Sequence, residues 1–445
     1  MRLNLWSPLP PSASGIADYV AEALPLLTRR FEVTAIVEDP GIVEAAVATR
    51  VPVRSPTDAP VADLDLYQIG NSPSHAFVYR AALARPGVIA LHEWSLHHLV
   101  LKETVERGLV PAYLREMRRA HGETGSFLGR QVARGLGGSM LPALFPLNDR
   151  LLEQSLGVVG LTSFVSERAA RRLPGRPVLH LPHHLALPLD PLPTRAEARR
   201  ALGLPREALL VTAPGFASAA KGLDAILRAV ARLRERHPAL RLVIAGDRDP
   251  ELHLSDLGMA MGVADRVILT GRLALPDFVR HLCAADVVMS LRFPTHGEIS
   301  GALVRALGVG RPVLVTAGTP ACDEFPEGVV VPVDPGPSQE DELVALLDRL
   351  LGDASLRDRI SALAQAHVRE HHDLARTVDS LAAFLDDVLA RKAEILSALA
   401  ADRAEEGTLV GYLMEEVRWG ARDLGLPGVP LDLAPLLKGL TGGQA

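Results

Sequence analysis

The feature that most constrains the fold is a rhythm of short apolar runs alternating with amphipathic stretches, which the 445-residue chain shows twice. The runs of the first half include "RLNLW", "EVTAIV", "DLYQIG" and "GVIALH", and those of the second half include "ALLVTAPG", "LRLVIAGD", "RVILTG", "DVVMSL" and "PVLVTAG". Successive Val, Ile and Leu residues in such runs are typical of parallel strands that helices cover on both faces. The sequence therefore predicts an α/β protein with two Rossmann-like, doubly wound domains.

A proline-dense stretch divides the two halves. Its prolines are Pro182, Pro188, Pro191 and Pro193. Such a density of proline resists both helix and sheet and suits a linker. We predict an N-terminal domain over residues 1–185, a C-terminal domain over residues 186–375, and C-terminal helices with a tail over residues 376–445.

The tail contains an amphipathic segment over residues 396–420. Its apolar residues at roughly helical spacing are Leu396, Leu399, Leu409, Leu413 and Val417. Three roles are open for this segment: packing on the core, formation of a homo-oligomer, or contact with a membrane surface.

Charge and cysteine content narrow the partners and the compartment. The net charge of −6 argues against nucleic acid as the main partner, because binding to a phosphate backbone normally requires a basic excess. Cys283 and Cys322 are the only cysteines, which fits a reducing compartment and gives no basis for a structural zinc site. The chain starts without an apolar signal core, and no uncharged apolar run is long enough to span a bilayer. We predict a cytoplasmic protein, with a peripheral position at the inner face of the membrane as the alternative.

Two loops of the second half carry residues suited to an anion. In "PTHGEISGALVRALGVGRPVLV", Glu298, Ser300 and Gly301 stand where a helix begins. The start of a helix offers unpaired backbone N–H groups and partial positive charge. In "APGFASAAKG", Gly215 ends a strand and Lys221 can supply a full positive charge. Together the loops predict a clamp for a diphosphate, although a serine there is often only a helix cap and a lysine is often only solvated.

Taken as a set and in order, several motifs resemble the retaining GT-B glycosyltransferases of family 4. They are "SPLPPSASGIADY", "YQIGNSPSHAF", "GVIALHEWSLHH", "GVVGLTSFVSERAARRL", "AAKGLDAILRA", "RLVIAGD", "DRVILTG" and "AADVVMSLRFPTHGEISGALVRALGVGRPVLVT". The resemblance runs from residue 7 to about residue 390. It implies a GT-B fold whose two domains face each other across a cleft, and a hexosyltransferase activity that retains the anomeric configuration.

The resemblance also implies the partners. A nucleotide-diphosphate-sugar donor would be held mainly by the C-terminal domain. A hydroxyl acceptor, which could be a sugar, a glycan, a lipid-linked molecule or a small molecule, would be held mainly by the N-terminal domain. No cofactor and no essential metal are expected.

The resemblance carries over residue by residue. Gly15 would approach the donor phosphates or the acceptor, His92 would face the donor sugar, and Lys221 would bind the diphosphate. Main-chain groups of the "DRVILTG" loop would contact the base. The donor-binding set is Gly15, Gly215, Lys221, Val267, Arg292, Glu298, Ile299, Ser300, Gly301 and Arg305, and the catalytic set is His92, Lys221 and Glu298.

The chain departs from the family pattern at its acidic pair. The family commonly has two glutamates eight positions apart, and here Gly297 and Arg305 occupy those positions. We interpret Glu298 as the working carboxylate of a "GExSG" variant, with Arg305 facing a phosphate. The family also tends to carry an arginine before the lysine, and Arg292 could replace it. The missing second glutamate keeps one alternative open, a nucleotide-sugar-binding protein with weakened catalysis. A GT-B-like epimerase or hydrolase that acts on the same donor is a further alternative.

On the acceptor side, the motifs point to Asn71, His75 and Glu93. Each also has a structural alternative, as a helix cap, a turn residue or the partner that orients His92. Glu324 matches a glutamate that often follows the next strand, or is a solvated loop acid. The arginine-rich stretch over residues 115–134 could meet anionic lipid or an anionic acceptor, or form a solvated helical face.

Overall fold

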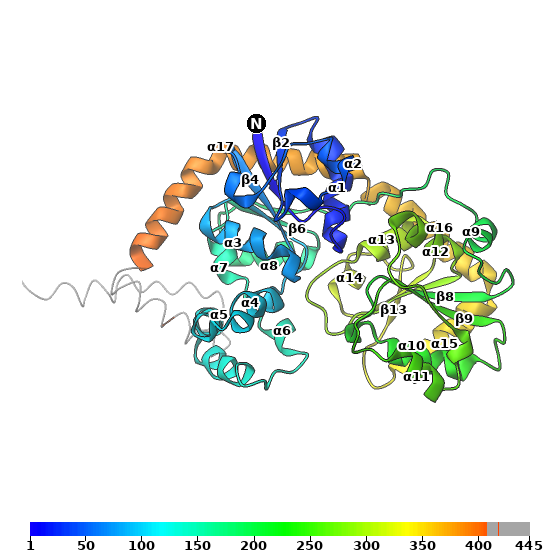
Figure 1. Ribbon diagram of the computed structural model, residues 1–445. Coiled ribbons are helices and arrows are strands. Elements are labelled where there is room, and N and C mark those ends of the chain that lie inside the picture. Colours follow the sequence, from blue (N-terminus) through cyan, green and yellow to red (C-terminus); the bar gives the residue numbers. More distant parts are fainter. Residues whose placement is uncertain (407–416, 418–445) are drawn as a thin grey trace, which may run out of the picture. The chain divides into compact units, whose positions relative to one another are not determined.

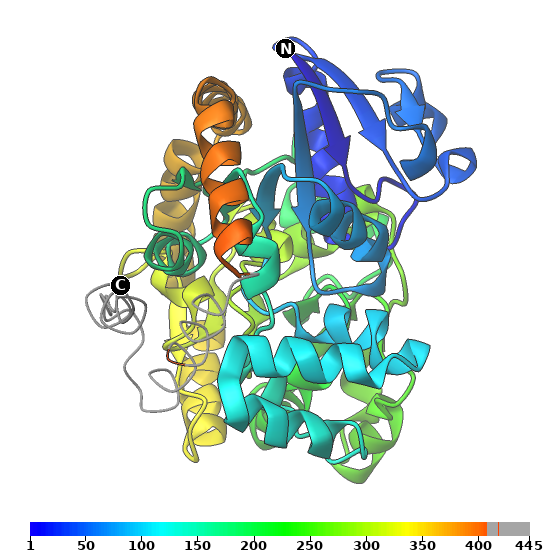
Figure 2. The same cartoon turned by 90° about the vertical axis from the view of Figure 1, so that its left-hand side faces the viewer.

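The computed structural model describes residues 1–406 and Val417. It divides the chain into two compact units. The first contains Met1–Leu181 and the chain from Val378 onward, and the second contains Pro182–Thr377. Each unit is a parallel sheet with helices on both faces (Figure 1), and Figure 2 shows the same cartoon turned by 90°. The predicted α/β class with two doubly wound sheets is confirmed.

The first unit has a seven-stranded sheet in the order β3-β2-β1-β4-β5-β6-β7. Its strands are β1 (Arg2–Trp6), β2 (Glu32–Ile36), β3 (Val53–Arg54), β4 (Leu64–Ile69), β5 (Val88–Leu91), β6 (Gly157–Gly160) and β7 (Val178–His180). Its α-helices up to residue 181 are α1 (Gly15–Leu27), α2 (Ala45–Ala48), α3 (Ala76–Ala84), α4 (His97–Glu103), α5 (Val110–Val132), α6 (Leu141–Leu144), α7 (Asp149–Glu153) and α8 (Ser163–Arg172). Short 3₁₀ turns η1 (Pro40–Ile42), η2 (Pro56–Asp58), η3 (Pro73–His75) and η4 (Val105–Arg107) lie in the connections.

The second unit has a six-stranded sheet in the order β10-β9-β8-β11-β12-β13. Its strands are β8 (Leu209–Pro214), β9 (Leu240–Ala245), β10 (Val267–Leu269), β11 (Val287–Ser290), β12 (Val313–Thr316) and β13 (Val331–Val333). Its helices are α9 (Arg195–Ala201), α10 (Leu223–Leu233), α11 (Leu254–Ala260), α12 (Leu275–Ala284), α13 (Gly301–Gly308), α14 (Pro320–Asp323), α15 (Gln339–Gly352) and α16 (Ala354–His371), with 3₁₀ turns η5 (Ala219–Lys221) and η6 (Ala264–Arg266).

The long helix α17 (Leu374–Glu406) changes the predicted division of the chain. We predicted a separate segment over residues 376–445, but the helix joins the first unit from Val378 onward. The reason is packing: Gly157 of β6 has no side chain, and a Cβ there would meet Val388 at 3.1 Å and Phe384 at 3.2 Å. The sheet can therefore accept α17 at close range. Of the predicted amphipathic tail, residues 407–416 and 418–420 lie outside the described residues.

Both sheets contain a point where the strand order reverses. In the first sheet β1 pairs with β2 on one side and with β4 on the other. In the second sheet β8 pairs with β9 on one side and with β11 on the other. At such a point the loops that follow the two strands diverge, and ligands of open α/β sheets bind in the opening. The loops after β8 and β11 are the two that the sequence singled out.

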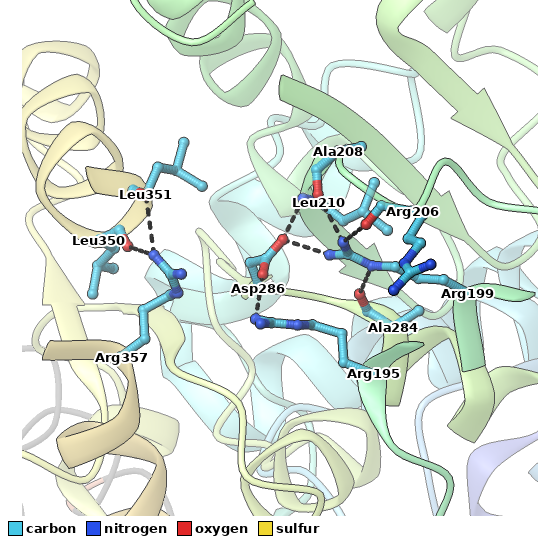
Figure 3. Close-up of polar contacts among 10 residues, drawn as sticks. All are labelled: Arg195, Arg199, Arg206, Ala208, Leu210, Ala284, Asp286, Leu350, Leu351 and Arg357. Atoms are coloured by element: carbon cyan, nitrogen blue, oxygen red, sulfur yellow. Dashed lines mark hydrogen bonds and ion pairs between the residues drawn. The ribbon is translucent and has the colours of Figure 1, made fainter. Parts of the chain in front are cut away.

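A buried charged network ties the first helix of the second unit to its sheet (Figure 3). Arg199 of α9 is 5% exposed, and its guanidinium donates to the carbonyl groups of Ala284, Arg206 and Ala208. Asp286, also buried, accepts from Arg199 Nη2 at 2.6 Å and from the backbone N–H of Leu210 at 2.7 Å. Arg195 reaches the same carboxylate at 2.6 Å but is 45% exposed. On α16, Arg357 donates to the carbonyls of Leu350 and Leu351 at the end of α15.

This network predicts unequal effects of removing its members. Asp286→Ala leaves the buried Arg199 guanidinium without its carboxylate, which should lower the free energy of unfolding by about 3–5 kcal/mol. Arg195→Ala removes a mostly exposed partner and should cost about 1 kcal/mol or less. Chemical unfolding of both variants beside the unmodified protein measures the difference. Equal losses for the two variants would contradict a structural role for the buried pair.

Candidate functional site

The loop after β8 holds Lys221 over the end of its own strand. Gly215 follows the strand with a positive φ of 81°, and Gly222 follows Lys221 with a φ of 59°. These two left-handed positions, which favour glycine, turn the chain so that η5 lies above the strand end. The Lys221 ammonium donates a hydrogen bond to the carbonyl oxygen of Pro214, the last residue of β8. A Cβ built on Gly215 would lie 3.1 Å from Lys221 Nζ, so the glycine gives the ammonium its room.

The loop after β11 is fastened directly to the Lys221 loop. The backbone N–H of Phe293 donates to the carbonyl of Ala220 at 2.8 Å. The backbone N–H of Arg292 donates to Thr316 Oγ1 of the neighbouring strand β12 at 2.8 Å. These contacts place the Lys221 loop beside the segment that leads into the Glu298–Gly301 loop. The site therefore forms within the second unit, at the reversal point of its sheet.

Two positive charges meet in this place. Burial, together with the charge of Arg292, lowers the pKa of Lys221 to about 7 from its ordinary value near 10.5. Each positive charge raises the free energy needed to keep the other side chain charged. A bound anion would lower this free energy for both side chains. Lysines with such lowered pKa values in a strand-end loop are candidates for a functional site.

Glu298 is engaged on both of its carboxylate oxygens. Oε1 pairs with Arg292 Nη1 at 2.9 Å, and Oε2 accepts from the His296 N–H at 2.6 Å and from Thr295 Oγ1 at 3.1 Å. Burial alone would raise the pKa of Glu298, but Arg292 and the hydrogen bonds outweigh it and lower the pKa below its ordinary value. As it stands, this carboxylate orders its own loop and orients Arg292. Its contact with a sugar stays a prediction.

The first turn of α13 is crowded by two nitrogen-bearing side chains. Ser300 is the N-cap residue, and its side chain makes no capping hydrogen bond. A Cβ on Gly301 would meet Arg305 Nη1 at 2.9 Å and His183 Nε2 at 3.1 Å, so both side chains reach the start of the helix. Arg305 is buried, and Ile299 is part of the packed base of the loop. Sequence reasoning missed His183, whose only signal is its place in the "LPHHL" stretch just after the first domain.

A second close approach of backbone lies beside Lys221. Gly246, directly after β9, has a φ of 147°, and a Cβ there would meet the carbonyl oxygen of Gly215 at 2.6 Å. Its N–H donates to Thr270 Oγ1 at 3.0 Å. Sequence reasoning missed Gly246 as a site residue, although the parallel endings "VTAPG" and "VIAGD" could have revealed it. Val267 begins β10, the edge strand of this sheet, and its main-chain contact with the donor base stays a prediction.

In the first unit, Gly15 and the candidate histidines lie in the loops after β1, β4 and β5. Ser14 caps α1 by accepting from the Ile16 N–H at 3.2 Å. Gly15 is exposed, and a Cβ there would meet no atom within 4 Å, so a ligand could approach it. His92 follows β5, and its Nε2 lies 2.7 Å from Gln68 Oε1. Because that oxygen only accepts, His92 Nε2 carries the proton.

The predicted acceptor residues have structural contacts. His75 is fully buried, burial lowers its pKa to about 4, and its Nδ1 donates to the Gln68 carbonyl at 2.9 Å. Asn71 is buried, and its Oδ1 accepts from the Leu99 N–H of α4 at 2.9 Å. Glu93 Oε1 accepts from the Asn71 N–H at 2.7 Å. All three residues thus have structural roles in the loops, and their contact with an acceptor stays a prediction. Gln68, which sequence reasoning missed, also contacts His92.

The two units thus hold different parts of the predicted set. The second gathers Lys221, Arg292 and Glu298 with the start of α13, and Arg305 beneath it. The first unit contains Gly15, His75 and His92, which lie in the loops after β1, β4 and β5. Glu324 is the C-cap residue of the short helix α14, and its functional role stays a prediction.

Known families match part of the chain. Residues 207–353, which include the whole Lys221–Arg305 region, match the family model described as Glycosyl transferases group 1. D-inositol 3-phosphate glycosyltransferase of Thermobifida fusca is 34% identical over 210 residues, a match that covers 44% of this chain and 46% of the relative. Alpha-D-kanosaminyltransferase of Streptomyces kanamyceticus is 27% identical over 199 residues and is covered to 49%. The chain thus matches less than half the length of these curated relatives.

Solved structures resemble the chain over most of its length. Anabaena Alr3699/HepE in complex with UDP-glucose has a TM-score of 0.59 at 16% identity, and the match covers 87% of this chain and 100% of that one. WaaG, a glycosyltransferase involved in lipopolysaccharide biosynthesis, has a TM-score of 0.58 at 16% identity, with 86% and 99% covered. At these identities the likeness shows the fold alone. The chain has the GT-B fold, and the fold that the sequence motifs implied is confirmed.

The charge pair at the reversal point can be tested without any ligand. The sequence contains only four lysines, so ¹³C-methylated lysines give an NMR spectrum in which Lys221→Met assigns the signal of interest. Lys221 should titrate near pH 7. Arg292→Met should move this pKa upward, because a neighbouring positive charge disfavours the protonated amine. Arg206→Met, at an 85% exposed side chain of the same unit, is the control and should leave the titration unchanged. An unchanged Lys221 pKa in the Arg292→Met variant would contradict the proximity of the two side chains.

Proposed function

We propose that this protein is a hexosyltransferase of class EC 2.4, which transfers a sugar from a nucleotide-diphosphate-sugar to a hydroxyl acceptor. The observation that carries the proposal is the placement of Lys221 and Arg292 side by side at the reversal point of the second sheet, next to the start of α13. This arrangement lies inside the segment that matches the glycosyltransferase family model.

The donor's diphosphate would take the place between the two cations and the helix start. When the glycosidic bond to the diphosphate breaks, negative charge grows on the phosphate oxygens. The Lys221 ammonium, the Arg292 guanidinium and the N–H groups of Ser300 and Gly301 are fixed in position to stabilise that charge. Glu298 would hold Arg292 in the required orientation. Because the protein supplies the positive charge, we propose that the reaction needs no essential metal.

Residues of the first unit would contact the acceptor and the sugar of the donor. Gly15 leaves space for a ligand at the start of α1, and His92 is held by Gln68 with its Nε2 protonated. We propose that His92 faces the donor sugar, and that the acceptor attacks the face from which the diphosphate leaves, which retains the configuration at the anomeric carbon. The base and sugar of the donor are to be selected by a thermal-shift panel of UDP-, GDP-, ADP- and TDP-sugars, because a ligand of the native state raises its stability. The acceptor is to be selected by nucleoside diphosphate release across a broad panel of acceptors.

A second candidate is a nucleotide-sugar-binding protein with little turnover. Two observations favour it. Both carboxylate oxygens of Glu298 already have partners within the protein. Arg305 stands where the sequence motif leads us to expect a second acid. The two candidates differ in one readout. A transferase releases nucleoside diphosphate when an acceptor is supplied, whereas a binding protein shows a thermal shift with a donor and no release with any acceptor of a broad panel. A GT-B-like epimerase would convert the donor without an acceptor.

Lys221→Met should reduce turnover by about 10²-fold or more, because it removes a charge that stabilises the leaving group. The assay is nucleoside diphosphate release with the selected donor and acceptor, run in EDTA to test the proposed independence from metal. Lys102→Met is the matched control: that side chain pairs with Glu106 on the surface of the first unit, and turnover should be unchanged. Unchanged turnover of the Lys221 variant would overturn the site assignment.

Donor affinity should depend on pH through Lys221. Its pKa in the free protein is about 7, and the bound diphosphate should raise it. Below pH 7 the amine is already charged and the Kd stays constant. Above pH 7 binding requires proton uptake, so the Kd should rise about tenfold per pH unit until the bound-state pKa is reached. Calorimetry with the selected nucleotide sugar from about pH 6 to about pH 8.5, in buffers of different ionisation enthalpy, measures both effects. A flat profile, or one that persists in Lys221→Met, would contradict the role of Lys221.

A further inference from the structure

The segment from the second half of α5 to α6 presents large apolar side chains to solvent. Phe127 is 56% exposed, Leu136 is 68% exposed and Leu144 is 64% exposed, and Met140 between them is also exposed. We name Phe127, Arg130, Arg134, Leu136, Met140 and Leu144 the α5–α6 patch. In the ribbon views this segment is cyan to teal (Figures 1 and 2). Several large exposed apolar side chains in one short stretch mark an interaction surface better than scattered single ones.

The backbone explains why these side chains point outward. α5 is broken at His121 and Gly122, where Gly122 has a φ of 58°. After the break the helix packs back on its own first half, since a Cβ on Gly125 would meet the Met117 carbonyl and a Cβ on Gly129 would meet Leu114 and Met117. The glycine face is therefore buried. Phe127, Arg130 and Arg134, at spacings of three and four, lie on the opposite exposed face.

The charge of this stretch differs from that of the whole protein. The protein carries a net charge of −6, yet residues 124–148 contain Arg130 and Arg134 and no aspartate or glutamate. Within the part of the chain that the structure describes, neither arginine has an ion-pair partner, and both are exposed. The patch thus combines exposed apolar side chains with unneutralised positive charge.

We propose that the α5–α6 patch binds the surface of a bilayer that contains anionic lipid. Arginines can pair with anionic lipid headgroups, while neighbouring aromatic and aliphatic side chains insert into the acyl layer beneath them. The patch carries both kinds of side chain. A second copy of the chain fits less well, because a symmetric contact would bring like positive charges together. No helix within residues 1–406 is long and apolar enough to span a bilayer, so the interaction proposed is with its surface. The proposal is independent of the catalytic role.

Co-sedimentation with phosphatidylcholine vesicles, with and without phosphatidylglycerol, tests the proposal. The full chain should sediment only with the phosphatidylglycerol vesicles, and added salt should weaken the binding. Arg130→Glu/Arg134→Glu and, separately, Phe127→Ser/Leu144→Ser should each reduce the partition coefficient about tenfold or more. Because these side chains are exposed, circular dichroism and thermal unfolding should stay as in the unmodified protein.

The matched control changes an exposed arginine and an exposed apolar residue outside the patch. Arg50→Glu/Val61→Ser fits, because Val61 is 81% exposed and Arg50 is exposed, and its vesicle binding should remain that of the unmodified protein. The proposal is overturned if vesicle binding of the unmodified protein does not increase with phosphatidylglycerol. It is also overturned if the patch variants bind these vesicles as well as the unmodified protein does. Concentration-dependent self-association that Phe127→Ser/Leu144→Ser abolishes, without vesicle binding, would also overturn it and assign the patch to a second copy.

Discussion

The candidate site depends on two basic side chains that neighbouring strands of the second sheet place together: burial first, and then the charge of Arg292, lowers the pKa of Lys221. β8 and β11 are neighbours at the reversal point, and the hydrogen bond from Phe293 to Ala220 fastens their loops to each other. This hydrogen bond holds the backbone of the Lys221 loop beside that of the Arg292 loop. Glu298 pairs with Arg292, whereas the hydrogen-bond partner of the Lys221 ammonium among the described residues is the Pro214 carbonyl. A bound anion would stabilise both basic side chains, which supports the diphosphate site that we propose.

The sequence predicted what depends on local pattern. The Val/Ile/Leu runs are the strands, and the glycines after them mark where backbone approaches backbone, because a parallel sheet imposes both. Lys221 and the Glu298–Gly301 loop could be paired because each follows a strand. What could not be read were side-chain contacts between distant segments. Gln68 orients His92 from β4, and His183 reaches Gly301 from a segment over a hundred residues earlier, and no local pattern records either contact.

Burial adds to what the sequence could say of Asn71 and His75. Sequence alone could not choose, for either residue, between a turn with a helix cap and a wall of the acceptor pocket. The structure gives both of them backbone partners and removes them from solvent. The last helix, which the sequence analysis assigned to a C-terminal segment, lies with the first unit. Contact between α17 and β6 depends on the missing side chain of Gly157, which a strand pattern does not reveal.

The second unit is one continuous stretch of chain, whereas the first is made from both ends. Where the chain enters and leaves the second unit, Leu185 and Asp373 form a β-bridge, and the Leu185 N–H donates to the His372 carbonyl at 2.7 Å. During synthesis the first sheet therefore emerges from the ribosome without its α17 cover. The β6 surface around Gly157 stays uncovered until the whole second unit has been translated. The first unit, whose sheet is synthesised first, is therefore the last to receive all of its helices.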